Sequence, residues 1–174
     1  MRRPYISNRK VYKTYHHSSI LRNIVMITKI CNRVFLGDAQ DAKNWGGRIL
    51  CVLENRPPDE PPHAIIIPIL RLVHNKVANQ MQLQTRDDGQ IHADVRMLDI
   101  VADVINLSVA RGEDILVHCG AGIERGPLAV AWYLHKYKDM SIEDAYKMIK
   151  SMRKETADRS VWLSKLANEL PVIA

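Results

Sequence analysis

The feature that most restricts the fold of this chain is a run of five consecutive apolar residues, 49–53 (Ile-Leu-Cys-Val-Leu). A strand with one face in water alternates apolar and polar side chains, whereas a continuous apolar run fits a strand buried on both faces of a parallel sheet. Such a sheet needs helices on both sides to cover it. With 174 residues, the chain is long enough for one domain of this kind with its own core.

Other segments fit the strands and helices of such a domain. Further strands are expected at residues 26–36 (interrupted at 31–33), 63–67, 81–85 and 115–117. Helices are expected at residues 39–44, 95–110, 127–137, 142–152 and 160–170. Residues 68–79 are ambiguous, and the spacing of their apolar side chains favours a short helix, whereas the prolines of residues 56–62 predict a stiff exposed loop. The expected fold is a single α/β domain with a mainly parallel sheet flanked by helices.

The net charge of +6 is concentrated at the start of the chain. The first 25 residues hold six basic and no acidic side chains, and the remainder holds 19 of each sign. We therefore expect a basic N-terminal arm over residues 1–25 and a neutral domain over residues 26–174, so basic composition is weak support for a nucleic-acid-binding surface on the domain. Three roles for the arm stay open: electrostatic attraction only, docking on the domain through Ile20, Leu21 and Ile24, or exchange onto a second copy to form a homodimer.

Three cysteines are too few for a disulfide framework, which favours the cytoplasm or another reducing intracellular compartment. The longest apolar run, residues 64–70, has seven residues and contains a proline, so no membrane association is expected. No second histidine or cysteine lies at metal-ligand spacing beside His118 and Cys119, so the sequence predicts neither a metal nor a cofactor.

The chemistry of the chain is predicted from residues 115–127, where an apolar strand leads through a loop with two glycines to a helix headed by Pro127. Cys119 follows the strand and Arg125 lies six residues later. Successive backbone N–H groups in such a loop and the helix N-terminus together bind an oxyanion, and the arginine fork matches two of its oxygens. The same positive field favours the Cys119 thiolate, a nucleophile for phosphoryl transfer through a cysteinyl-phosphate. His118 is expected to bond the loop backbone and support the thiolate.

Residues 117–134 resemble the cysteine-dependent dual-specificity protein phosphatases of the protein tyrosine phosphatase superfamily. The resemblance extends from the opening segment, 27–38, to Met140–Ala145 and Arg153, and covers about residues 26–170 in order. It implies a phosphatase-like fold and hydrolysis of phosphotyrosine, phosphoserine and phosphothreonine in proteins. The residues that it places around the substrate phosphate are Gly120, Ala121, Gly122, Ile123, Glu124 and Arg125.

The resemblance also implies a general acid about thirty residues before the cysteine, and the chemistry needs one because an alkoxide is a poor leaving group. Asp87 and Asp88 lie 32 and 31 residues before Cys119. Alignment of the following helix favours Asp88, with Asp87 as the alternate. The same carboxylate would then activate water against the cysteinyl-phosphate.

Two departures from the family pattern bear on function. Gly126 stands where the family usually has Ser or Thr, a hydroxyl that stabilises the departing cysteine, and this leaves a catalytically weak phosphate-binding module as an alternative. Residues 124–127 also resemble the rhodanese-fold cell-division-cycle phosphatases, although Gly122 and the flanking segments fit the first family better. The loop carries no lysine, which argues against phosphoinositides. RNA is a less favoured partner than a phosphoprotein, through an RNA 5′-triphosphatase activity in which the basic arm would hold RNA.

Overall fold

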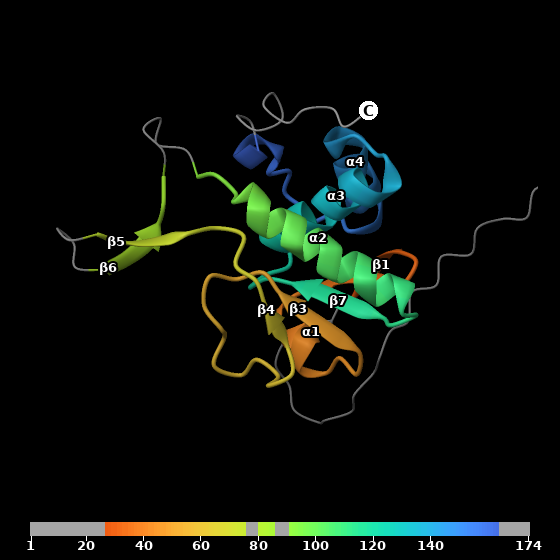
Figure 1. The fold of residues 1–174 in the computed structure, drawn as a ribbon, viewed down its shortest axis with the longest axis horizontal. Helices are drawn as coiled ribbons and strands as arrows, with labels where there is room; N and C mark the ends of the chain where they lie inside the picture. Colours follow the sequence, from red (N-terminus) through yellow and green to blue (C-terminus); the bar gives the residue numbers. More distant parts are fainter. Residues whose placement is uncertain (1–26, 76–79, 86–90, 164–174) are drawn as a thin grey trace, which may run out of the picture.

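Strand β7 (Ile115–His118) lies at the centre of a five-stranded sheet in the computed structural model of the chain (Figure 1). The structure describes residues 27–75, 80–85 and 91–163. The sheet has the order β1-β2-β7-β3-β4, with β1 (Thr28–Cys31), β2 (Val34–Gly37), β3 (Arg48–Cys51) and β4 (Ile65–Ile66). β7 runs parallel to both β2 and β3, β4 runs parallel to β3, and the edge strand β1 is antiparallel to β2. The expectation of a mainly parallel sheet is therefore confirmed.

Helices cover the two faces of the sheet unequally, as Figure 1 shows. The short helix α1 (Ala39–Lys43) packs on one face, where Ala42 joins Ile49 and Leu116 in a small cluster. The opposite face carries the main core, to which Leu50 and Val117 contribute from the sheet. The elements that pack over this core are α2 (Val95–Ala110), α3 (Arg125–Lys138), α4 (Ile142–Met152) and the 3₁₀ helix η1 (Ser160–Leu163).

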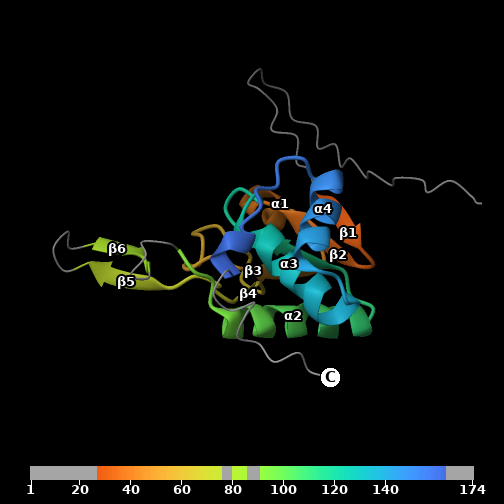
Figure 2. The ribbon, with the colours of Figure 1, turned by 90° about the horizontal axis from the view of Figure 1, so that it is seen from above.

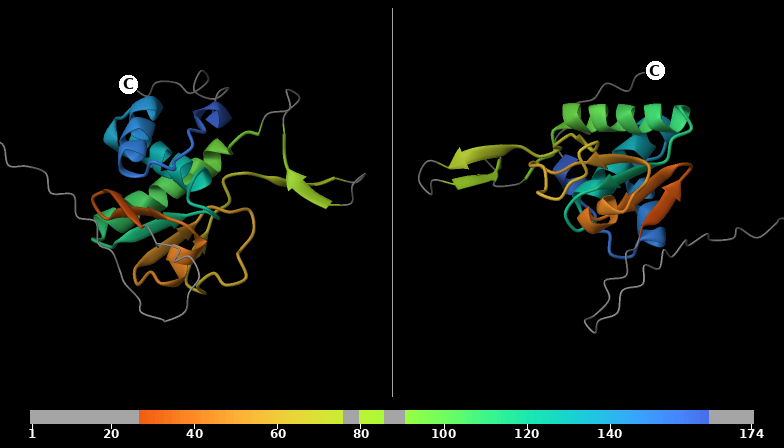
Figure 3. Two further views of the ribbon diagram at one scale, coloured as in Figure 1. Left: turned by 180° about the vertical axis from the view of Figure 1, so that it is seen from behind. Right: turned by 90° about the horizontal axis from the view of Figure 1, so that it is seen from below.

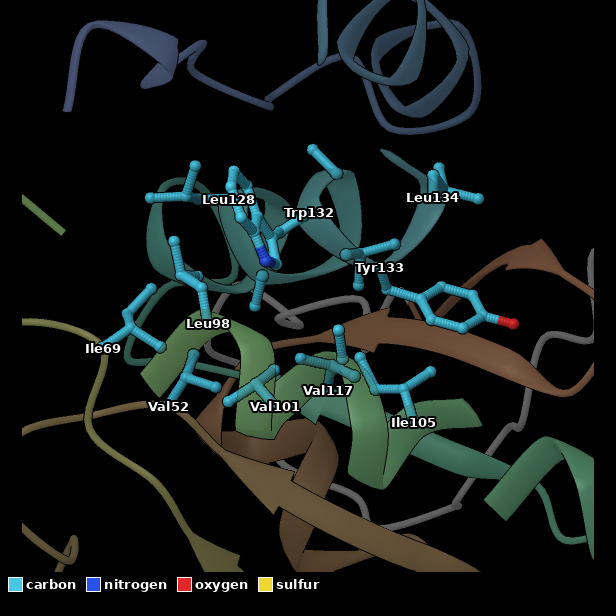
Figure 4. Packing of buried hydrophobic residues seen from close by; sticks show 14 of the residues in the cluster. Val52, Ile69, Leu98, Val101, Ile105, Val117, Leu128, Trp132, Tyr133 and Leu134 are labelled. Carbon is cyan, nitrogen blue, oxygen red and sulfur yellow. The ribbon is translucent and has the colours of Figure 1, made fainter. Parts of the chain in front are cut away.

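Helix α3 is the central helix of the domain. Its residues are buried without interruption from Gly126 to Leu134, because α2, α4 and the sheet all pack against it. Figure 4 shows Leu128 and Trp132 of α3 above the α2 side chains, and Trp132 Nε1 also donates to Asp99 Oδ1 at 3.0 Å. The helix begins two residues before Pro127, which therefore lies in the first turn, where its missing N–H leaves no bond unmade. This packing fixes the N-terminus of α3 against the end of β7.

The helix expected over residues 68–79 is wrong. The structure instead has an antiparallel ribbon of β5 (Leu72–Asn75) and β6 (Gln80–Leu83), which projects from the body of the domain (Figures 2 and 3). The carbonyl of Ile69 accepts from the N–H of Asp94 at 2.8 Å, so it is not available to a helical turn. Pairing with β6, the next strand in the sequence, decides the conformation against the helical spacing of the apolar side chains.

The N-termini of two helices are capped by side chains. Asp38 caps α1 in a capping box with Asp41, and Ser141 caps α4 by accepting from the N–H of Asp144. The helix expected over residues 160–170 is described only as η1, and its remainder lies outside the described residues, as does the arm. Among the helices that the structure describes, none is long and apolar enough to cross a membrane.

Candidate active site

The cysteine of the predicted phosphate loop lies at the carboxyl end of β7, between the ends of β2 and β3. Cys119 is 2% exposed, and α3 begins at Arg125. In open α/β sheets, ligand sites form beyond the carboxyl ends of strands where the following segments diverge. Here β2 leads into α1, whereas β3 leads into the long loop of residues 52–64. The loop of residues 119–125, hereafter the phosphate loop, therefore lies where the fold favours a ligand site.

The backbone carbonyls of the phosphate loop are held from outside by other segments. The contacts are Ala39 N–H to Gly120 O at 3.1 Å, Arg153 Nε to Gly122 O at 2.9 Å, and Ala157 N–H to Ile123 O at 3.0 Å. The donors come from the start of α1, the end of α4 and the segment after α4. Because these carbonyls are engaged on the outer side of the loop, its peptide N–H groups are turned toward the inner side.

The N–H groups of the phosphate loop remain available to a ligand. In the part of the chain that the structure describes, no backbone N–H of residues 120–124 donates to another protein group. The N-cap residue of α3, Glu124, likewise makes no capping hydrogen bond through its side chain. Unused N–H groups beside the positive end of a helix can bind a tetrahedral oxyanion.

Gly122 gives the phosphate loop its turn. Its φ of +66° is one that L side chains rarely adopt, and an added Cβ would lie 2.4 Å from the carbonyl oxygen of Gly37. The loop backbone thus passes directly over the end of β2. A glycine is required at this position for both reasons.

Arg125 is oriented by an acidic partner from the loop that follows β3. Its Nε donates to Glu54 Oε1 at 2.8 Å, and the two side chains are 20% and 11% exposed. Glu54 follows β3 in the chain, just as Cys119 follows β7, so the parallel pairing of these strands brings them to one edge. The contact engages one side of the guanidinium and leaves both terminal nitrogens for a bound oxyanion.

The remaining residues of the phosphate loop face outward or support it. Gly120 and Ala121 are exposed, and Ile123 is half-buried. Glu124 forms an ion pair with Arg159, whose guanidinium lies 5.3 Å from the ring centre of Trp162. Glu124 is thus tied to the segment after α4 instead of facing solvent alone.

His118 is fully buried behind the phosphate loop. Its Nδ1 lies 3.3 Å from the carbonyl oxygen of Cys119, in agreement with the predicted bond to the loop backbone. Its Nε2 lies 2.8 Å from Glu60 Oε1. The second contact was not expected, because the proline-rich segment was predicted to be an exposed loop, whereas the Glu60 side chain is 1% exposed.

Three buried side chains in this region could hold a metal ion. Cys51, Glu60 and His118 each offer one ligand atom, and these atoms lie within 4.8 Å of one another. The Glu60 oxygen and the His118 nitrogen, however, are 2.8 Å apart, closer than the about 3.3 Å or more that separates two ligands on a tetrahedral zinc ion. Burial raises the pKa of Cys51 to about 11, so this side chain stays a thiol. Within this cluster, Glu60 and His118 are instead paired with each other by a hydrogen bond.

The two candidate acids, Asp87 and Asp88, lie outside the described residues. The described residues on either side of them, Thr85 and Ile91, pair in an isolated antiparallel bridge. Gln84, next to this bridge, lines the same cavity as Glu54, the partner of Arg125. Gln84 and Glu54, which come from segments about thirty residues apart in the sequence, therefore line one cavity.

Sequence analysis missed the residues that hold the phosphate loop from outside. Glu54 had a usable signal, because it follows the strand over residues 49–53 that was predicted to lie in a parallel sheet. Arg153 was named only as part of the resemblance to the phosphatase family, and nothing in the sequence indicates that it donates to the Gly122 carbonyl. Glu60 gave no signal, because local sequence cannot reveal that one residue of an exposed loop turns inward.

With this geometry established, comparisons with known proteins identify the family. Residues 60–168 match the family model described as dual specificity phosphatase, catalytic domain. Because the match spans more than half of the chain, the chain belongs to this family. The resemblance seen in the sequence is thereby confirmed.

Solved structures of the same fold agree with this assignment. Human DUSP28 superposes with a TM-score of 0.60 at 21% identity, over 82% of this chain and 92% of that one. The PTP-2 phosphatase of Cydia pomonella gives a TM-score of 0.56 at 15% identity, over 82% and 88% of the two chains. At these identities, the likeness shows the fold alone.

Curated relatives match over shorter stretches. The protein 123R of Invertebrate iridescent virus 6, which is named as a tyrosine phosphatase, is 31% identical over 81 residues, or 47% of this chain and 57% of that protein. Human dual specificity protein phosphatase 16 is 35% identical over 69 residues, or 40% of this chain and 10% of that protein. The matched stretch thus covers little more than half of the first relative and a tenth of the second.

The Gly122 geometry predicts a large and position-specific loss of stability. Gly122→Ala combines a strained φ with a backbone clash, so the free energy of unfolding should fall by at least about 2 kcal/mol. Gly120→Ala is the matched control in the same loop, since an added Cβ there meets nothing within 4 Å. Urea unfolding of both variants measures the difference, and equal stabilities would contradict the described loop conformation.

Proposed function

We propose that this chain hydrolyses phosphomonoesters of proteins through a cysteinyl-phosphate on Cys119. The observation that carries the proposal is the phosphate loop, whose carbonyls are engaged outward while its N–H groups stay unused beside a buried cysteine. Arg125, oriented by Glu54, supplies a guanidinium for the equatorial oxygens of the phosphoryl group. Membership of the dual specificity phosphatase family supports the same chemistry.

The proposed reaction has two steps. In the first, the Cys119 thiolate attacks phosphorus, the bond from phosphorus to the ester oxygen breaks, and that oxygen takes a proton from Asp88, with Asp87 as the alternate. In the second, a water gives its proton to the same carboxylate and attacks phosphorus, and the S–P bond breaks to return the thiolate and inorganic phosphate. The positive field of the phosphate loop stabilises the transferring phosphoryl group in both steps.

The proposed substrate class, phosphoproteins, is supported by the charge of the phosphate loop and by the family. The phosphate loop has no lysine to match a highly anionic lipid headgroup, and the family matched is one of protein phosphatases. We propose residues 26–174 as the catalytic domain, working where thiols stay reduced. Residues 1–25 would form a separate basic arm that attracts an acidic partner or a second copy of the chain.

A panel of substrates tests the proposal. Phosphotyrosine, phosphothreonine and phosphoserine peptides, a phosphoinositide and 5′-triphosphorylated RNA would be compared for phosphate release, with and without residues 1–25. The proposal expects multiple turnover on phosphopeptides. Preferred release of γ-phosphate from RNA would contradict it in favour of the triphosphatase, and phosphopeptide binding without turnover would contradict it in favour of a binding module.

Substitution of the nucleophile and substitution of the arginine should lower turnover with different effects on anion binding. Cys119→Ser should lower kcat by at least about 10³-fold while the protein still binds vanadate or a phosphopeptide. Arg125→Lys keeps the charge but loses the planar fork, so it should weaken both vanadate inhibition and kcat. Steady-state hydrolysis of an aryl phosphate measures both, and wild-type turnover in Cys119→Ser would rule out the mechanism.

The general acid is tested with a pair of neighbouring variants. Asp88→Asn should lower kcat by about 10²-fold or more on a phosphoserine peptide, and less on an aryl phosphate, whose leaving group needs little protonation. The basic limb of the pH–rate profile should also disappear. Asp87→Asn is the matched control and should behave as wild type, whereas the reverse pattern would assign the role to Asp87.

Because Gly126 has no hydroxyl, we expect hydrolysis of the cysteinyl-phosphate to be slow, and a serine at this position should accelerate it. A Cβ at this position would lie 3.8 Å from the Cys119 nitrogen and 3.3 Å from Leu36 Cδ2, so Gly126→Ser brings a hydroxyl close to Cys119 at a small steric cost. One added hydrogen bond to the departing thiolate should speed dephosphorylation of the enzyme about tenfold. Gly126→Ala carries the steric cost without the hydroxyl, and equal rates in the two variants, measured by rapid quench, would contradict the prediction.

A further inference from the structure

Glu60 is a buried carboxylate on a loop that is otherwise mostly at the surface. It lies in the segment between β3 and β4, where its own N–H donates to the Pro57 carbonyl at 3.0 Å in a tight turn. Its side chain is 1% exposed. A buried charge is costly unless it is paired, so the structure must supply Glu60 with a partner.

That partner is His118, the residue before the proposed nucleophile. Glu60 Oε1 lies 2.8 Å from His118 Nε2, and His118 is 0% exposed. On its other side, His118 Nδ1 lies 3.3 Å from the carbonyl oxygen of Cys119. A carboxylate and a carbonyl can only accept, so both contacts are hydrogen bonds only when each ring nitrogen carries a proton.

The other groups around His118 leave Glu60 as its counter-charge. Cys51, beside His118 in the parallel pair of β3 and β7, stays a thiol because burial raises its pKa to about 11. Asp41 approaches from α1, but it is mainly burial that raises the pKa of this carboxyl, and one of its oxygens accepts from the Asp38 N–H at 2.9 Å. Glu60 is the acidic side chain in direct contact with the ring.

The loop that carries Glu60 is anchored at several points, so its carboxylate is held in place. Arg56 donates to the Pro61 carbonyl and to the Ala64 carbonyl, each at 3.2 Å. Asp59, next to Glu60, forms an ion pair with Lys43 of α1 at 2.8 Å, and its side chain is 73% exposed. Asp59 and Glu60 are therefore adjacent in sequence but lie in different surroundings. The Asp59 side chain is at the surface, whereas the Glu60 side chain is buried against His118.

We propose that Glu60 is a positioning residue for the Cys119 nucleophile. It keeps His118 protonated on both nitrogens, and the ring then holds the carbonyl of Cys119 and places a positive charge behind the phosphate loop. The proposal rests on the proposed function in one respect only, that Cys119 acts as a thiolate. Through Glu60, the proline-rich loop would influence the reactivity of Cys119 without contacting the substrate.

The test compares Glu60→Gln with Asp59→Asn, which removes the same charge one residue away. In Glu60→Gln the ring keeps an acceptor at Nε2 but loses its counter-charge, so it gives up the Nδ1 proton that bonds Cys119. Alkylation of Cys119 by iodoacetamide, followed by mass spectrometry at mildly acidic pH, should slow about tenfold, and the acidic limb of kcat/KM should move to higher pH. Asp59→Asn should match wild type. Equal alkylation rates and pH profiles in the two variants would overturn the proposal.

Two further measurements keep the proposal testable if Glu60→Gln folds poorly. In the wild-type protein, the ¹⁵N chemical shifts of His118 at pH 7 should show protons on both nitrogens, and a neutral ring with one bare nitrogen would overturn it. In a His118→Gln background, adding Glu60→Gln should change alkylation no further, whereas additive effects would show that Glu60 does not act through His118. Neither readout needs turnover, so loss of the proposed phosphatase function would be seen separately.

Discussion

The structure depends on one constraint: contacts from the rest of the protein must hold the backbone of residues 119–125 so that its N–H groups point inward. A short loop left to itself satisfies its polar groups locally or with water. Here the loop carbonyls accept hydrogen bonds from Ala39, Arg153 and Ala157, which lie outside the loop. These bonds fix the peptide planes, and the N–H groups of residues 120–124 make no hydrogen bond to the described part of the protein. Gly122 makes this possible because it adopts a positive φ and lets the loop pass against the end of β2.

The surrounding fold serves this constraint with elements that are distant in sequence. β2 provides the surface under the loop, α1 gives the Ala39 N–H, and the end of α4 gives Arg153. The segment after β3 gives Glu54 for Arg125 and Glu60 for His118. Glu54 contacts the guanidinium of Arg125 and Glu60 contacts the ring of His118, so this one segment contacts a residue at each end of the phosphate loop. Burial of α3 among α2, α4 and the sheet keeps its N-terminus aligned with the loop.

The elements that sequence predicted best are those with a strong local signal. Helix α2 has the predicted bounds because its apolar face and its Asp94 cap act within one segment. The segment 68–79 was predicted wrongly because pairing of β5 with β6 overrides a weak helical spacing. At the candidate site, Cys119 and Arg125 could be predicted because their spacing is itself the signal for the proposed chemistry. Arg153 and Glu60 could not, since their roles arise only when chain segments 31 and 58 residues away meet the loop region.

The central claim is that Cys119 carries the phosphoryl group during turnover. The most direct measurement is acid quenching of the protein during hydrolysis of a phosphotyrosine peptide, followed by mass spectrometry of the peptide that contains Cys119. The account predicts phosphate on the Cys119 sulfur, at a level that rises within the first turnover and then stays constant. Sustained hydrolysis with no phosphate on Cys119, or with phosphate on another residue, would contradict it.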